Sequence, residues 1–231
     1  TSVIMLVIKD IIRILKKKNI DFFTGVPDSV LKGFSSNLKN YDKNKHIIAA
    51  NEGNAIAIAS GHYLATNNLP LVYMQNSGLG NAINPLLSLC DPDVYSIPMI
   101  ILIGWRGEPG VKDEPQHVKQ GKVQEELLNV LNIPYECISS DEKNFTKKIS
   151  KCAQLAKKES RPVVILARKG TFASYEIKTK NLSTSVISRE DVLCKIIANL
   201  NQKSIIVSTT GKTSREIFEI RKFKIYNLSF N

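Results

Sequence analysis

The sequence of 231 residues lacks the features that mark membrane-spanning and disulfide-stabilised proteins. No apolar run reaches the roughly 18–20 residues that a membrane-spanning helix requires. The four cysteines, at positions 90, 137, 152 and 194, are scattered and form no C-x-x-C pair. Isolated thiols of this kind are typical of reduced cytoplasmic proteins. We therefore expect a cytoplasmic protein without a disulfide framework and without a membrane partner.

The first eighteen residues lack the charge order of a secretory signal. Their apolar stretch is interrupted by Lys9, Asp10 and Arg13, and the lysine cluster follows this stretch instead of preceding it. A cleaved signal has its positive charges first. The segment 3–18 is therefore predicted to be an amphipathic helix.

Lysine and arginine outnumber aspartate and glutamate by 32 to 21, which gives a formal net charge of +11. A basic balance of this kind can indicate nucleic-acid binding. The lysines are spread over several predicted helix faces, however, and aromatic residues are not interleaved with them. We interpret most of the excess as solvated surface and expect no nucleic-acid partner. The remaining positive field would steer a small multivalent anion into a cleft.

Strand-like and helix-like segments alternate regularly up to about residue 168. Helices are predicted over 3–18, 28–38, 52–66, 80–89, 123–131 and 142–158, and strands over 21–24, 46–50, 71–74, 99–103, 135–138 and 162–166. The strand over 46–50 is expected to be buried. This alternation predicts an α/β fold, a doubly wound and mostly parallel sheet with helices on both faces. Ligands of such sheets bind beyond the carboxyl ends of the strands.

The regular alternation predicts a first domain over 1–170, followed by a Ser- and Thr-rich linker over 171–188. A second α/β unit is then predicted over 189–231, with helices at 189–199 and 214–221 and strands at 204–208 and 224–228. About forty residues are too few for a core of their own. We therefore expect this unit to be the incomplete start of a second domain.

One carboxylate lies at the start of an otherwise small and apolar helix in the segment 46–61, HIIAANEGNAIAIASG. Glu52 stands at the predicted turn from strand to helix. It is either a first-turn carboxylate that complements the helix dipole or a poorly solvated carboxylate that shares a proton with a bound heterocycle. The segment alone leaves both roles open.

Two further segments place polar side chains directly after predicted strands. In G-V-P-D-S, Asp28 and Ser29 either cap the next helix or point into the cleft. In Q-N-S-G-L-G-N, residues 75–81, Asn76 and Asn81 offer neutral hydrogen-bonding groups between glycines. This second segment is not the G-x-G-x-x-G fingerprint of a dinucleotide site. An ordinary turn is the alternative for it.

A long loop is predicted over 104–121, GWRGEPGVKDEPQHVKQG, after the fourth apolar strand. Loops of this length in compact domains are often functional. Arg106 suits a carboxylate or a phosphonate, because its guanidinium offers paired N–H donors. His117 suits proton transfer near neutral pH. A surface or structural role for this histidine stays open.

Taken together, these segments resemble the thiamine diphosphate-dependent decarboxylases of 2-oxo acids. The resemblance is carried, in this order, by GVPDS, NEGNAIAIASG, QNSGLGNAINPL, GWRGEPGVKDEPQH and ARKGTF, and it covers residues 11–170. The later segment TTGKTSRE resembles the start of the family's diphosphate-binding domain. The resemblance implies a pyrimidine-binding domain and a 2-oxo acid substrate that bears a phosphonate, with a sulfonate as the alternative.

The resemblance also implies roles for the matched residues. Glu52 would hydrogen-bond the aminopyrimidine ring of thiamine diphosphate and control its tautomer. Gln116 and His117 lie where several relatives place residues that shuttle protons. The residues expected near the substrate are Asp28, Ser29 and Arg106, the last from its charge alone. The residues expected beside the cofactor, in addition to Glu52, are Asn76, Gly78, Gly80 and Asn81.

The sequence contains no G-D-G, the motif through which this family binds Mg2+ and the cofactor's diphosphate. We therefore expect the magnesium site to lie outside this chain segment. The chain would then be a fragment, a truncated product or one subunit of a split enzyme. Because the family builds its site between subunits, the resemblance implies a homo-oligomer. The alternative outside enzymology is a dimerising module that binds no cofactor.

Overall fold

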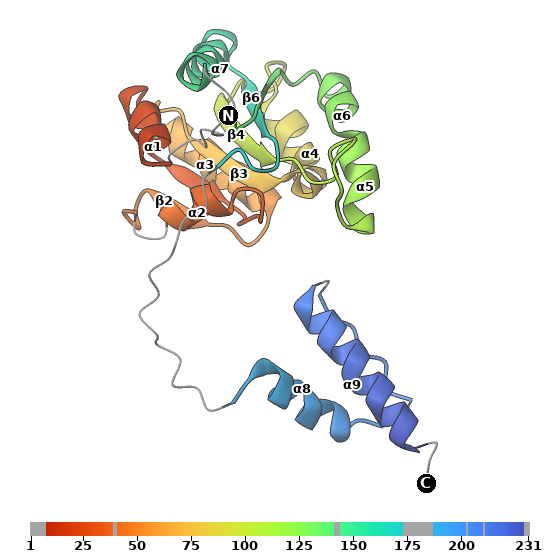
Figure 1. Ribbon diagram of the computed structural model, residues 1–231. Helices are drawn as coiled ribbons and strands as arrows, with labels where there is room; N and C mark the ends of the chain where they lie inside the picture. Colours follow the sequence, from red (N-terminus) through yellow and green to blue (C-terminus); the bar gives the residue numbers. More distant parts are fainter. Residues whose placement is uncertain are drawn as a thin grey trace. The chain divides into compact units, whose positions relative to one another are not determined.

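The structure is a computed structural model that describes the backbone of residues 8–38, 41–140, 144–172, 187–201, 203–209 and 211–228 (Figure 1). The chain divides into two compact units, Thr1–Ile177 and Lys178–Asn231, and each is described by itself. Most of the predicted linker lies outside the described residues. No helix in the described part of the chain is long and apolar enough to cross a membrane.

A six-stranded sheet forms the centre of the first unit, with the strand order β2-β1-β3-β4-β6-β5. Its strands are β1 Phe23–Gly25, β2 His46–Ile48, β3 Leu71–Gln75, β4 Met99–Gly104, β5 Tyr135–Ile138 and β6 Pro162–Ala167. All of its strand pairs are parallel, so the predicted parallel α/β fold is confirmed. From β1 the chain first adds β2 on one side and then β3 on the other, so the strand order switches between β1 and β3. Such folds usually bind ligands at this switch point.

Helices cover both faces of this sheet (Figure 1). They are α1 Ile8–Lys17, α2 Lys32–Leu38, α3 Glu52–Thr66, α4 Leu79–Pro85, α5 Pro115–Lys122, α6 Gln124–Val130 and α7 Phe145–Glu159. A 3-10 turn, η1 Asn76–Gly78, precedes α4, and a π-helical segment, η2 Leu86–Cys90, follows it. Alternate strand residues enter two separate cores, as Leu102 of β4 packs toward α1, α2 and α7, and Ile101 toward α3, α4 and α6.

Three local predictions for the first unit were wrong. Strand β2 is an edge strand in which Ile47 and Ile48 are 38% and 61% exposed, and so it is not buried. A short apolar run such as IIAA, residues 47–50, cannot by itself distinguish an edge strand from a central one. Helix α2 begins only at Lys32, because residues 28–31 form a turn. The second half of the predicted loop over 104–121 is helix α5.

The end of the first unit also differs from the prediction. Thr171 and Phe172, which the composition placed in the linker, pack within the first unit. The Thr171 hydroxyl donates to the carbonyl oxygen of Ile138 at 3.2 Å, and the Phe172 side chain is buried. These contacts extend the first unit past residue 170.

The second unit consists of two helices that pack against each other, α8 Arg189–Ala198 and α9 Lys212–Leu228. The two strand predictions for this unit were wrong. Residues 204–208 are described without a partner strand, and Ile205 and Val207 are each 91% exposed. Residues 224–228 belong to α9. Apolar alternation yields a strand only where a neighbouring strand accepts its backbone hydrogen bonds.

Candidate active site

The predicted site residues lie at the carboxyl ends of four neighbouring strands. Asp28 and Ser29 follow β1, Glu52 follows β2, the segment 76–81 follows β3, and the segment 106–117 follows β4. Because these strands are parallel, their carboxyl ends meet at one edge of the sheet. This edge includes the reversal point between β1 and β3.

Glu52 is the first residue of α3 and is held by a short polar network. Asn51 caps the helix, since its side-chain oxygen accepts from the backbone N–H of Asn54 at 2.9 Å. The Oε2 atom of Glu52 accepts a hydrogen bond from the Nδ2 atom of Asn81 at 2.8 Å. Glu52 is half-buried. The strand-to-helix turn and α4 therefore fix the carboxylate jointly.

The residues predicted to lie beside the cofactor separate into two groups. Gly78 and Asn81 both touch the Glu52 carboxylate, and a Cβ atom added at Gly78 would collide with that carboxylate. Gly80 does not contact Glu52: it is exposed, and nothing lies within 4 Å of where its Cβ would stand. The requirement for glycine at 78 is therefore one of space.

Asn76 is fully buried and is bound to the loop after β4. Its Nδ2 atom donates to the carbonyl oxygen of Arg106 at 2.9 Å, and its Oδ1 atom accepts from the N–H of Arg106 at 3.1 Å. Gln120 of α5 donates to the Asn76 carbonyl oxygen at 3.3 Å. The side chain of Asn76 thus fixes the position of Arg106.

Arg106 joins the loop after β4 to the loop after β1. Its NH1 atom donates to the Ser29 hydroxyl oxygen at 2.8 Å. Its Nε atom donates to Oδ2 of Asp113 at 2.8 Å, and its NH2 atom also binds that carboxylate. Asp113 accepts two backbone N–H bonds besides, from Gly107 and Glu114, both at 2.8 Å. Side-chain hydrogen bonding from Arg106 holds the pKa of Asp113 well below its usual range.

Asp113 organises this loop, and the sequence analysis gave it no role. A buried carboxylate with several donors is a strong local organiser. The available signal was its spacing of seven residues from Arg106 within a loop rich in glycine and proline. Arg106, Asp113 and Ser29 together form the polar link across this edge of the sheet.

Asp28 is buried behind Ser29. Its Oδ2 atom accepts from the backbone N–H groups of Val30 at 2.8 Å and Leu31 at 3.1 Å, which makes it the cap of the turn before α2. Its Oδ1 atom has no hydrogen-bond partner among the described residues. Burial raises the pKa of Asp28, against the opposing effect of these N–H donors and of Arg106. The carboxyl of Asp28 therefore stabilises the turn.

Of the two predicted proton carriers, the structure brings only His117 to this cluster. The Nδ1 atom of His117 lies 3.4 Å from Nε2 of Gln75, which donates in turn to the Ser77 hydroxyl at 2.8 Å. Helix α5 comes this close because Gly107, at a φ of +69°, has no side chain to meet the His117 carbonyl. Gln116 is exposed, with no hydrogen bond to the cluster among the described residues.

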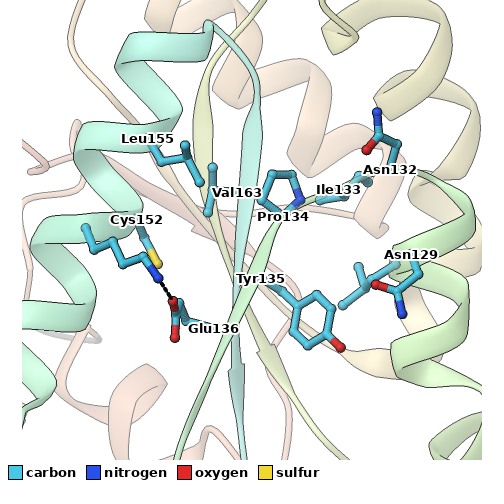
Figure 2. Close-up of a pocket in the computed structure, with 11 residues that line it drawn as sticks. Asn129, Asn132, Ile133, Pro134, Tyr135, Glu136, Cys152, Leu155 and Val163 are labelled. Atoms are coloured by element: carbon cyan, nitrogen blue, oxygen red, sulfur yellow. Dashed lines mark hydrogen bonds and ion pairs between the residues drawn. The ribbon is translucent and has the colours of Figure 1, made fainter.

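A cavity of about 430 Å³ lies at the opposite end of the sheet, at the start of β5 (Figure 2). Glu136 and Lys151 form an ion pair beside it, and its walls include Tyr135 and Cys152. Burial raises the pKa of the Cys152 thiol to about 12, so this sulfur stays protonated and unreactive. None of the predicted site residues lines this cavity. We therefore place the candidate site at the carboxyl edge.

Comparison with known proteins gives a consistent set of similarities. Residues 5–131 match the family model described as thiamine pyrophosphate enzyme, N-terminal TPP binding domain. The chain is 32% identical over 212 residues to phosphonopyruvate decarboxylase of Streptomyces viridochromogenes, an alignment that covers 85% of this chain and 52% of that protein. The chain thus spans about half the length of these phosphonopyruvate decarboxylases, since a second one, from Streptomyces hygroscopicus, is also covered to 52%.

Two further similarities concern the first unit and the fold. The alpha subunit of sulfopyruvate decarboxylase from Methanocaldococcus jannaschii is 36% identical over 156 residues, which cover 66% of this chain and 87% of that subunit. The crystal structure of benzoylformate decarboxylase from Polynucleobacter necessarius aligns with a TM-score of 0.57 at 19% identity. That alignment covers 84% of this chain and 36% of the other, and at this identity it supports the fold alone.

Proposed function

The chain belongs to the thiamine pyrophosphate enzymes, and we propose that it carries the pyrimidine-activating half of a 2-oxo acid decarboxylase site. The observation that carries this proposal is the Glu52 carboxylate at the start of α3. One of its oxygens is held by Asn81, and the absence of a side chain at Gly78 gives the carboxylate the room that it occupies. A carboxylate fixed in this way can share a proton with a ring nitrogen of the cofactor.

The residues present fit thiamine diphosphate at this edge. Glu52 would hold the aminopyrimidine through Oε1, which has no hydrogen-bond partner among the described residues, and Gly78 leaves the room that this carboxylate occupies. When bound, the cofactor supplies the electron-accepting ring that makes loss of carbon dioxide possible. The protein's part is to set the protonation of the aminopyrimidine and to orient the substrate. We place the Mg2+ and diphosphate contacts on residues outside this chain segment.

The substrate that we propose is 3-phosphonopyruvate, which would yield phosphonoacetaldehyde and carbon dioxide. Ser29 and Arg106 would bind an anionic group of the substrate. Arg106 uses only part of its five N–H donors on Asp113 and Ser29, so donors remain for a ligand. His117 would supply the proton that replaces the lost carboxylate, with Gln75 orienting its ring. Gln116, which is exposed beside His117 on α5, is given no part in this step.

Sulfopyruvate is the second candidate substrate, because the first unit matches most of the alpha subunit of a sulfopyruvate decarboxylase. The two acids differ in their tail, since a phosphonate can carry a second negative charge and a sulfonate cannot. The test is carbon dioxide release from each acid by the complete enzyme, with benzoylformate as control. A higher kcat/KM for sulfopyruvate would replace the first substrate by the second, and turnover of neither would refute the decarboxylase proposal.

We also propose that the chain works in the cytoplasm as part of a homo-oligomer whose site is completed across subunits. In support, no Asp, Glu, Lys or Arg occurs from Gly53 to Cys90, although these residues make up 23% of the chain. This stretch includes the exposed face of α3, where Leu64 is 68% exposed. Leu64→Arg should therefore reduce the oligomer size seen by analytical ultracentrifugation. Val130→Arg, at an exposed position of α6, is the control that should leave it unchanged.

The domain assignment belongs to the same proposal. We assign the first unit, predicted over residues 1–170 and extended by Thr171 and Phe172, to the pyrimidine-binding domain, and residues 189–231 to the start of the diphosphate-binding domain. The isolated chain should then bind thiamine diphosphate weakly and turn over no substrate. Titration calorimetry with magnesium should show little heat at micromolar cofactor. Binding near micromolar affinity or tighter would place the diphosphate contacts within this chain.

A further inference from the structure

We propose that Asn81 is a positioning residue that determines which oxygen of Glu52 is left to share a proton with the cofactor. This inference deepens the proposed function and rests on it. The two carboxylate oxygens have different surroundings in the structure. Oε2 accepts from the Asn81 amide at 2.8 Å, whereas no hydrogen bond to Oε1 is found among the described residues.

The position of Asn81 is itself tightly constrained. Asn81 lies in the first turn of α4, and a Cβ atom added at Gly53 of α3 would stand only 2.9 Å from the Asn81 carbonyl oxygen. The starts of the two helices are therefore in direct contact. The Asn81 amide reaches Oε2 from the first turn of α4, and on its other side the carboxylate lies against Gly78, where an added Cβ atom would collide with Oε1.

The surroundings of Glu52 make one hydrogen bond decisive. The elements that pack against it, α3, η1 and α4, contribute no charged side chain, and the nearest charged residues along the sequence are Lys45 and Asp91. An amide N–H donates and cannot accept, so a proton on Oε2 would face another donor. The proton of a protonated Glu52 therefore resides on Oε1, the oxygen beside Gly78.

Asn81→Asp tests this assignment with almost no change in size. It replaces the donor by a second carboxylate opposite Oε2, and two carboxylates so close share one proton. The shared proton would then lie on the Oε2 side instead of the Oε1 side. Asn84→Asp is the matched control, because it adds the same charge one turn later on α4, where Asn84 is exposed and its side-chain oxygen accepts from the Ser88 hydroxyl at 3.1 Å.

The first readout requires neither cofactor nor activity. The Glu52 carboxyl carbon, identified in 13C NMR spectra by its loss in Glu52→Gln, is followed against pH in the full chain. We expect it to titrate at a higher pH in Asn81→Asp than in Asn84→Asp. Identical titration in both variants would overturn the proposal, whatever the enzyme's activity proves to be.

The second readout uses the complete enzyme with its cofactor bound. Exchange of the cofactor's C2 proton, measured by NMR, should slow about 100-fold in Asn81→Asp and about tenfold in Asn81→Leu, which only removes the donor. Cofactor affinity should change far less than the exchange rate. Unslowed exchange in both variants, or equal losses of affinity and rate, would refute the positioning role. Thermal melts of Asn81→Leu show whether the fold survives the loss of the amide.

If the decarboxylase proposal fails but the Glu52 titration still responds to Asn81→Asp, the positioning role stands without the substrate assignment. If decarboxylation is confirmed and neither readout responds, the proposed function stands and Asn81 is only a packing residue. The two proposals can therefore fail separately.

Discussion

The two units of this chain contain similar apolar sequence patterns and bury them very differently. In the first unit, β3, β4 and β6 are covered on both faces, and nearly all of their side chains are buried. In the second unit, Ile205, Val207 and Phe218 are exposed, and Ile197 is the buried apolar side chain among the described residues. The comparison shows that an apolar pattern becomes structure only when neighbouring elements are present to cover it.

The largest effect that we expect is on the rate of catalysis, because we assign the catalytic residues to the first unit and none to the second. Glu52→Gln keeps the size of the side chain but removes its ability to share a proton. General acid–base contributions are typically about 10²–10⁴-fold, and we expect the rate of decarboxylation by the complete enzyme to fall by at least this range. The matched change Glu219→Gln, on exposed α9, should leave the rate unchanged.

A Glu52→Gln enzyme with an intact rate would return Glu52 to the simpler role of a first-turn helix carboxylate, a role that contributes about 0.3–1 kcal/mol to stability. Exchange of the cofactor's C2 proton separates the two roles directly. Unslowed exchange would remove Glu52 from the chemistry.

The next effect concerns the free energy of unfolding. Ile101→Ala deletes a fully buried side chain of β4 and should cost about 2–5 kcal/mol. Val207→Ala in the second unit should cost no more than about 0.5 kcal/mol, because its side chain is 91% exposed. Urea unfolding followed by the fluorescence of Trp105, the single tryptophan, reports on the first unit.

The Val207→Ala measurement needs a probe of its own, and hydrogen exchange of the amides in α8 and α9 supplies it. Protection that falls strongly in this variant would mean that Val207 is covered in solution. The contrast between the units would then be false.

A smaller effect, on the pH dependence of the free energy of unfolding, tests whether the Asp28 carboxyl is buried in the first unit. Because burial raises the pKa of this carboxyl, the folded protein binds its proton more tightly than the unfolded chain does. The folded protein then loses stability as the pH rises from the ordinary pKa of an aspartate, which applies to the unfolded chain, through the higher pKa of Asp28 in the folded protein. Asp28→Asn has no proton to lose, so its unfolding free energy relative to the parent should increase between pH 3 and pH 7. Urea titrations at both pH values measure this difference, and a decrease would contradict the sign.

The smallest effect concerns a buried amide that the first unit leaves unpaired. Gln124 is fully buried, and neither atom of its amide has a hydrogen-bond partner in the described residues. Such a group costs about 1–3 kcal/mol, so Gln124→Leu should stabilise the first unit by about 1 kcal/mol. Gln120→Leu is the control, because its amide is bonded to Asn76. A destabilised Gln124→Leu would indicate that a bound water satisfies the amide.

The contrast between the units also explains what the sequence could predict. Strands β3, β4 and β6 were predictable because long apolar runs have no other stable place in an α/β fold. The strand predicted over 224–228, KIYNL, has a weaker apolar pattern, and α9 continues through it. No partner strand for it is present among the described residues. The prediction of a strand failed because strand formation depends on neighbouring elements in the folded chain, and the local sequence pattern does not contain that information.

The candidate site was also predictable only in part: its positions along the chain were predicted, and its hydrogen bonds were not. The residues that follow strands were identified correctly as a group, since strand ends can be located from the pattern. Their partners were not, because the bonds of Asn76 to Arg106 and of Asp113 to Arg106 depend on side-chain geometry. Helix α5 was missed although Glu114 and Pro115 form a regular helix start, with the proline in the first turn.

The pairing of Asn76 with Arg106 has a mechanical consequence. Strands β3 and β4 pair up to Gln75 and Gly104, and beyond them the Asn76 amide replaces a peptide group by bonding both the N–H and the C=O of Arg106. The ladder thus gains one more rung while the main chain turns into η1. The segment 76–81, whose Asn81 binds Glu52, is consequently joined to the loop after β4, whose Arg106 binds Ser29. Between this segment and Ser29, the Asn76 and Arg106 side chains form two successive links.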